Sequence, residues 1–117
     1  MIKHLRISLA FLVALLFHVS CFRQTEVTVE ISVPQMGSPE CRSLVLQAID
    51  TLDREAVKRA DLDVNRRVAR VTYDSTAIAL KNIEYAITAA GFDANEERAT
   101  EEARARLPAA CRDERTD

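Results

Sequence analysis

The feature that most constrains the fold is the change of hydrophobic period across residues 33–41. Over residues 25–33, valine and isoleucine alternate with polar residues, which predicts a strand with one apolar face. Pro34 and Gly37 then end the strand and open a loop. Ser-Pro-Glu at residues 38–40 is a typical helix start, because serine is a preferred N-cap and proline is favoured at the first helical position. The helix is expected over residues 39–52, with one buried stripe formed by Cys41, Leu44, Val45, Ala48, Ile49 and Leu52.

The rest of the chain continues this alternation of element types. Strands are predicted over residues 57–64 and 68–73, joined by a turn at residues 65–67. A second helix is expected over residues 76–90, capped by Asp74-Ser75-Thr76 and ended by Gly91, and a short fourth strand over residues 92–95. The order strand, helix, strand, strand, helix, strand predicts an α+β fold. It is the ferredoxin-like βαββαβ sandwich, in which a four-stranded antiparallel sheet carries two helices on one face.

The two ends of the chain differ in composition from this domain. Residues 1–20 have a basic start and a short apolar run, the pattern of a secretory signal peptide. Cys21 follows where a bacterial lipoprotein carries its lipidated cysteine, although His18 departs from the usual aliphatic residue. Both a lipid-anchored protein and a released one are compatible with this sequence, and both are exported to the periplasm or cell envelope. Residues 96–117 are charged and helix-prone with little apolar surface, and residues 109–117 are expected to form a loose tail.

Charge and histidine content exclude several classes of function. Removal of residues 1–20 leaves 14 of the 16 basic residues against 18 acidic ones, a net charge near −4. A mildly acidic chain with interspersed charges lacks the basic footprint of a nucleic-acid-binding protein. His4 and His18 both lie in the predicted leader, so the mature chain has no imidazole for general base catalysis or metal ligation. We therefore do not expect an enzyme.

The chain carries a set of short features along its strands and helices: Val33-Pro34, Met36, Cys41, the stripe over residues 44–52, Tyr73-Asp74, Ile83, Ala86-Ile87 and Gly91-Phe92. With these features, residues 26–95 resemble a heavy-metal-associated (HMA) domain, and the leader makes the periplasmic mercury-binding type the most similar arrangement. The resemblance implies a metal-binding loop between the first strand and the first helix.

The metal-binding motif of the family is incomplete here. Members that bind metal carry Met-x-Cys-x-x-Cys, and this chain keeps Met36 and Cys41 but has Ser38 in place of the first cysteine. Cu(I), Hg(II) and Zn(II) prefer sulfur ligands, whereas a serine hydroxyl is a hard, neutral oxygen. Ser38 is better explained as an N-cap, and Met36 as packing beneath the loop with an auxiliary ligand role as the alternative.

Two cysteines carry the open questions. Cys41 is either a reactive thiolate and metal ligand at a helix N-terminus, or a small apolar residue on the helix stripe. Cys111 has three interpretations: a disulfide partner of Cys41, a substitute second metal ligand, or an incidental cysteine of the tail.

Two functions follow. The first is an exported soft-metal-binding or trafficking protein that uses Cys41, with the second ligand supplied by Cys111, a second copy of the chain in a metal-bridged homodimer, or a membrane metal transporter. The second is an HMA module that has lost metal binding and serves as a protein-interaction domain.

Overall fold

The computed structural model describes Val13 and residues 25–112. The ordered elements are β1 (Glu26–Ser32), α2 (Pro39–Asp50), β2 (Val57–Asp63), β3 (Val68–Asp74), α3 (Leu80–Ala89), α4 (Glu101–Ala105) and α5 (Ala109–Arg112). The predicted leader, including Cys21, lies outside the described residues, as do residues 113–117. Within the described part of the chain, the helices are too short or too polar to cross a bilayer.

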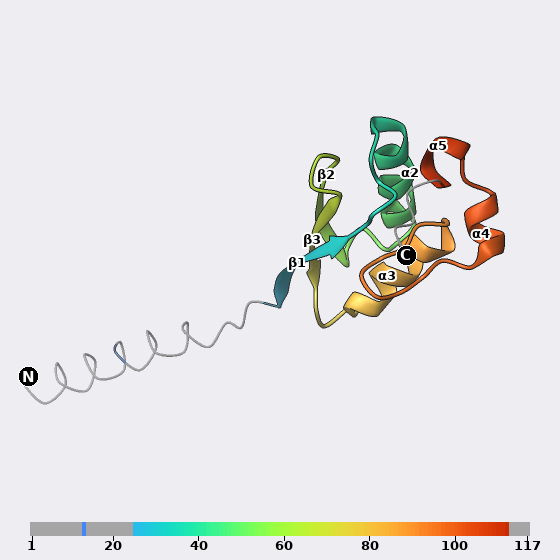
Figure 1. Cartoon of the computed structure of the whole chain (residues 1–117). Coiled ribbons are helices and arrows are strands. Elements are labelled where there is room, and N and C mark those ends of the chain that lie inside the picture. Colours follow the sequence, from blue (N-terminus) through green and yellow to red (C-terminus); the bar gives the residue numbers. More distant parts are fainter. Residues whose placement is uncertain (1–12, 14–24, 113–117) are drawn as a thin grey trace, which may run out of the picture.

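The three strands form one antiparallel sheet in the order β1-β3-β2. In this register Val29 lies opposite Val71, and Ala60 lies on the other side of Val71. Figure 1 shows α2 and α3 beside one face of the sheet, with α4 and α5 on the side of these helices away from the strands. The fold is therefore the expected α+β sandwich, with a third helical layer beyond it.

The core lies between the sheet and the helices, where the predicted apolar faces meet. In β3 the buried side chains alternate, and in α2 they recur at helical spacing, as expected. On the predicted apolar face of β1, Ile31 is buried and Val29 half-buried, whereas Val27 is exposed. The largest fully buried side chains are Phe92, Ile31, Met36, Ile49, Ile83 and Ile87.

The predicted fourth strand over residues 92–95 is not formed, so the observed sheet has three strands. The segment reaches the end of β1, where the Asn95 N–H donates to the Ser32 carbonyl. In a continued ladder the Ser32 N–H would donate to a backbone carbonyl, but here it donates to the side-chain oxygen Oδ1 of Asn95 at 2.9 Å. Asn95 has φ 52°, outside the β region, and an isolated bridge between Ala94 and Glu97 turns the chain back. A left-handed asparagine therefore replaces the strand.

The second helix begins at Leu80, four residues later than predicted. The Asp74 carboxylate accepts hydrogen bonds from both the N–H and the hydroxyl of Thr76, at 2.9 and 2.7 Å. These bonds close a turn at the end of β3 rather than capping a helix.

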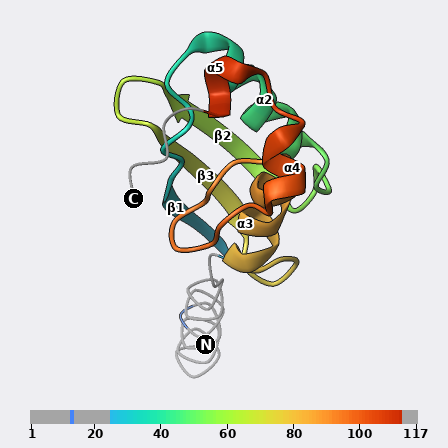
Figure 2. The same cartoon turned by 45° about the vertical axis from the view of Figure 1, so that its right-hand side comes forward.

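The C-terminal segment folds back over the domain instead of forming a loose tail at residues 109–112. Its buried side chains recur every four residues, at Ala99, Ala103, Leu107 and Cys111. Figure 2 shows α4 lying against α3 and α5 against α2. Gly91, with φ 109°, permits this packing, because a Cβ at this position would lie 2.6 Å from the Ala103 carbonyl oxygen.

Candidate metal-binding site

The N-terminus of α2 holds Cys41 in a capped first turn. Ser38 is the N-cap, as predicted, and its hydroxyl oxygen accepts a hydrogen bond from the Cys41 N–H at 3.2 Å. The same hydroxyl lies 3.1 Å from Cys41 Sγ, to which it donates. Ser38 is thus the capping residue of the cysteine helix, and its single hydroxyl contacts both the backbone and the sulfur of Cys41.

Cys41 is joined to Cys111 by a disulfide across 70 residues of sequence, with the Cα atoms 5.7 Å apart. Both cysteines are 1% exposed. Cys111 lies on α5, so the partner of Cys41 comes from the C-terminal segment and not from the first loop. Of the three interpretations of Cys111, the structure supports the disulfide partner. This chain has Ser38 in place of the first cysteine of the family motif, and Cys111 brings a second sulfur to the same helix end.

A buried methionine and a half-buried arginine hold the first loop in place. Met36 is fully buried, in agreement with a packing role. The Val33 N–H donates to the Arg67 carbonyl at 2.9 Å, and Arg67 Nη1 donates to the Pro34 carbonyl at 3.0 Å. Arg67 has φ 55°, so the turn between β2 and β3 adopts a left-handed residue to reach the loop. This half-buried arginine therefore supports the site through both its carbonyl and its guanidinium group.

A buried polar pair, Gln35 and Asp93, joins the first loop to the segment that follows α3. Gln35 Nε2 donates to Asp93 Oδ2 at 2.7 Å, and the Asp93 N–H donates to Gln35 Oε1 at 2.9 Å. The second carboxylate oxygen of Asp93 accepts from the Ala99 N–H at 2.9 Å, just before α4. The sequence does not reveal the roles of Gln35, Asp93 and Arg67, because each acts through contacts more than 30 residues away.

The donor set of the site consists of the two cysteine sulfurs of Cys41 and Cys111. Among the described residues, no group of three or more His, Cys, Asp or Glu side chains could hold a metal ion. Cys41 and Cys111 are brought together, Met36 lies buried, and Cys21 is outside the described residues. With the disulfide intact, neither sulfur is a thiolate, so the pair is a potential ligand set only in its reduced form.

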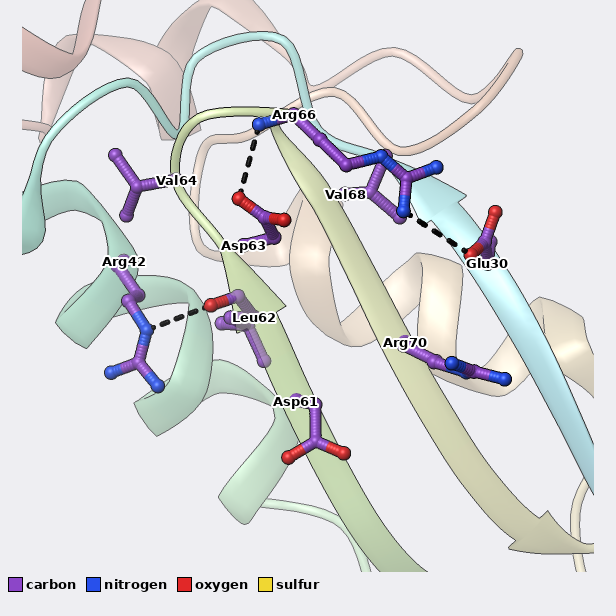
Figure 3. A pocket seen from close by; sticks show the side chains of 9 residues that line it. All are labelled: Glu30, Arg42, Asp61, Leu62, Asp63, Val64, Arg66, Val68 and Arg70. Carbon is purple, nitrogen blue, oxygen red and sulfur yellow. Dashed lines mark hydrogen bonds and ion pairs between the residues drawn. The ribbon is translucent and has the colours of Figure 1, made fainter.

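A separate pocket of about 450 Å³ lies near the turn between β2 and β3 and contains no sulfur (Figure 3). Its charged lining is balanced between three arginines and three carboxylates: Arg42, Arg66, Arg70, Glu30, Asp61 and Asp63. Several of these groups already have partners, including Arg42 Nε on the Leu62 carbonyl at 3.0 Å. The pocket is therefore not an extension of the cysteine site.

The folded domain is similar to solved metal-binding proteins. The oxidised MerP of Ralstonia metallidurans CH34 is 30% identical, with a TM-score of 0.55 over 60% of this chain and 94% of that one. The chain belongs to the heavy-metal-associated domain family. The match spans nearly all of MerP, so this HMA protein carries residues beyond the length of that relative.

Two further structures agree with this assignment. The CopZ metallochaperone is 26% identical, with a TM-score of 0.54 over 58% of this chain and 98% of that one. A copper-binding domain from the P-type ATPase HMA7 is 24% identical, with a TM-score of 0.54 over 58% and 89%, and shows likeness of fold alone. No family model matches the sequence, and no curated protein matches it either. These neighbours include a metallochaperone and a copper-binding domain, rather than enzymes.

Proposed function

We propose that this HMA protein binds or traffics a soft metal ion through the thiolates of Cys41 and Cys111 after their disulfide is reduced. The observation that carries the proposal is the position of Cys111, whose sulfur is bonded to that of Cys41 at the N-terminus of α2. The family motif has its second cysteine at this helix end. A second sulfur supplied from α5 compensates for Ser38, which replaces the first motif cysteine.

The surroundings of Cys41 favour the charged form of a released thiol. Cys41 lies in the first turn of a 12-residue helix, where the macrodipole stabilises negative charge. The Ser38 hydroxyl donates to the same sulfur. A thiolate is the form that binds metal, so both features support ligation by Cys41.

The number and type of ligands at the site favour some of the candidate ions over others. Zn(II) takes four ligands in tetrahedral geometry, whereas the described residues supply two sulfurs. Cu(I) and Hg(II) share the preference for sulfur, and we propose these two as the cargo ahead of Zn(II). The CopZ metallochaperone, which is 26% identical to this chain, supports a trafficking role.

Export and partners belong to the same proposal. The leader over residues 1–20 and the acyl acceptor position at Cys21 support a periplasmic or lipid-anchored protein. A disulfide between the two remaining cysteines is typical of an oxidising compartment. A membrane metal transporter is the proposed partner, and a metal-bridged homodimer becomes unnecessary if Cys111 supplies the second sulfur.

The buried disulfide also favours a second candidate function. Both sulfurs are 1% exposed, so the bond can serve purely as a structural cross-link in a module that no longer binds metal. Such a protein would act as an interaction domain whose stability does not depend on metal.

Metal stoichiometry under reducing conditions separates the two functions. We suggest titrating Cu(I) and Hg(II), without oxygen, into the chain lacking residues 1–20 and carrying Cys21→Ser. Uptake of a single ion per chain, lost in both Cys41→Ser and Cys111→Ser, supports the dithiolate site. Uptake lost only with Cys41→Ser points to a bridged dimer instead. Equal uptake by the parent chain and the Cys41→Ser, Cys111→Ser double variant would reject the metal-binding function and favour the interaction module.

A further inference from the structure

The last described segment, residues 108–112, is attached to the domain mainly through a cysteine. Within this segment Cys111 is the buried residue, and Pro108, Ala109, Ala110 and Arg112 are exposed. The hydrogen bonds of these described residues are local: the Cys111 N–H donates to the Pro108 carbonyl, and Arg104 Nη2 donates to the Arg112 carbonyl. We call residues 108–112 the C-terminal arm.

The segment just before the arm is anchored differently. Ala99, Ala103 and Leu107 are buried, and the backbone of Ala103 packs closely against Gly91. The Ala99 N–H is also bonded to the buried Asp93 carboxylate. These contacts contain no sulfur, so none of them includes the disulfide itself.

We propose that the C-terminal arm is a redox-controlled latch over the metal site: reduction of the Cys41–Cys111 disulfide releases residues 108–112 while α4 stays docked, and a bound soft ion closes the arm again. Release follows because the arm buries one small side chain, and that burial is weak without the covalent bond. The hinge lies between Leu107, which is docked, and Cys111. The closing step rests on the proposed function, whereas the opening step does not.

The geometry of metal binding requires such movement. A disulfide holds its two sulfurs about 2 Å apart. A metal–sulfur bond is about 2.3 Å long, taking zinc as the example. Two thiolate sulfurs on opposite sides of one ion therefore lie up to about 4.6 Å from each other. Cys41 is held on a 12-residue helix in the core, so the displacement falls on the short α5.

The reaction balances with a dithiol as the reductant. A thiolate of the dithiol attacks one sulfur of the bond, the mixed disulfide is resolved by the second dithiol sulfur, and the dithiol leaves as a cyclic disulfide. Two electrons and two protons pass to Cys41 and Cys111, which become thiols. When an ion then binds, both thiols lose their protons to water.

The opening step is tested by the protection of each thiol from alkylation. The chain lacking residues 1–20, with Cys21→Ser, is reduced with dithiothreitol, freed of reductant without oxygen, and pulsed with N-ethylmaleimide. For each cysteine, protection is the alkylation rate in urea divided by the alkylation rate in the folded protein. This ratio removes intrinsic differences in thiol reactivity. We expect protection of Cys111 to be at least about tenfold lower than protection of Cys41. Equal protection, or lower protection of Cys41, would overturn the opening step.

Amide hydrogen exchange tests the hinge and the closing step on the same samples. Upon reduction, the amide of Cys111 should exchange faster while the amides of Ala103 and Arg104 in α4 keep their protection. Loss of protection throughout α4 would reject a hinge after Leu107. Addition of Hg(II) or Cu(I) should restore protection in the arm. An ion that binds without restoring amide protection in the arm would reject the closing step alone. Absence of ion binding would reject the proposed function and leave the opening step intact.

Discussion

Gln35 and Asp93 lie 58 residues apart in sequence and exchange two hydrogen bonds in the protein interior. Gln35 belongs to the loop that leads to Cys41, and Asp93 follows α3. Asp93 also accepts from the Ala99 N–H, so one carboxylate holds both the loop before the site and the segment that carries Cys111 toward it. The two cysteines are therefore positioned by a shared polar group as well as by their disulfide.

Removal of this carboxylate should destabilise the fold. Asp93→Ala leaves the Gln35 amide and the Ala99 N–H without acceptors in a buried place, and we expect a loss of about 2–3 kcal/mol in the free energy of unfolding. Asp93→Asn keeps one acceptor oxygen and should cost less. Urea denaturation measures both. The exposed Asp50→Ala is the control, expected within about 0.5 kcal/mol of the parent. An Asp93→Ala protein as stable as the control would contradict the role of the pair.

A side chain at Gly91 should loosen the C-terminal segment. Gly91 has φ 109°, and an added Cβ would lie 2.6 Å from the Ala103 carbonyl oxygen and 2.8 Å from Leu107 Cγ. We expect Gly91→Ala to lower the free energy of unfolding by about 1–3 kcal/mol, because backbone strain and a backbone clash occur together. The matched control is Gly37→Ala, at an exposed glycine without a positive φ. Equal thermal midpoints for the two variants would argue against close packing of α4 on Gly91.

The turn after β3 predicts a local effect of pH. The Thr76 hydroxyl and N–H donate to the Asp74 carboxylate and hold the pKa of that carboxyl below its usual value of 3.8. A lowered pKa means that the turn is stabilised at neutral pH and that this contribution is lost as pH falls below about 4 through the folded pKa. Thr76→Ala removes the hydroxyl, so the Asp74 pKa should rise toward its usual value. Carboxyl-carbon NMR titration measures it, with Thr88→Ala as a distant control. An unchanged midpoint in Thr76→Ala would show that the hydroxyl does not stabilise the carboxylate.

The part of the fold that follows from local rules could be predicted from the sequence. Alternation placed β1 and β3 with their buried faces, and the capping rules placed Ser38 at the start of α2. The predictions of a fourth strand and of a helix start at residue 76 were wrong, because local side-chain hydrogen bonds compete with these rules. Asn95 and Asp74 use their side chains to bond backbone groups, and such bonds end strands and form turns.

Of the two cysteines of the site, only Cys41 could be assigned to it from the sequence. Cys41 was found because its loop and helix resemble the HMA family, but the pairing with Cys111 remained one of several alternatives. Two cysteines 70 residues apart meet only after α4 has folded back, and that packing depends on Gly91 and Asp93. The sequence does contain one signal of this packing, because alanine, leucine and cysteine recur every four residues from residue 99 to residue 111.

The disulfide itself should make a large contribution to stability. It closes a loop of 70 residues, and a cross-link of this kind typically adds about 2–4 kcal/mol by restricting the unfolded chain. Cys111→Ala should therefore lower the free energy of unfolding by about that amount relative to the oxidised parent, measured with urea in the absence of metal. The reduced parent is the matched control, and it should unfold within about 0.5 kcal/mol of Cys111→Ala, because both lack the cross-link and the arm buries little else. A reduced parent as stable as the oxidised one would mean that the cross-link does not hold the domain together. In that case neither the structural role of the bond nor a latch that depends on it could be maintained.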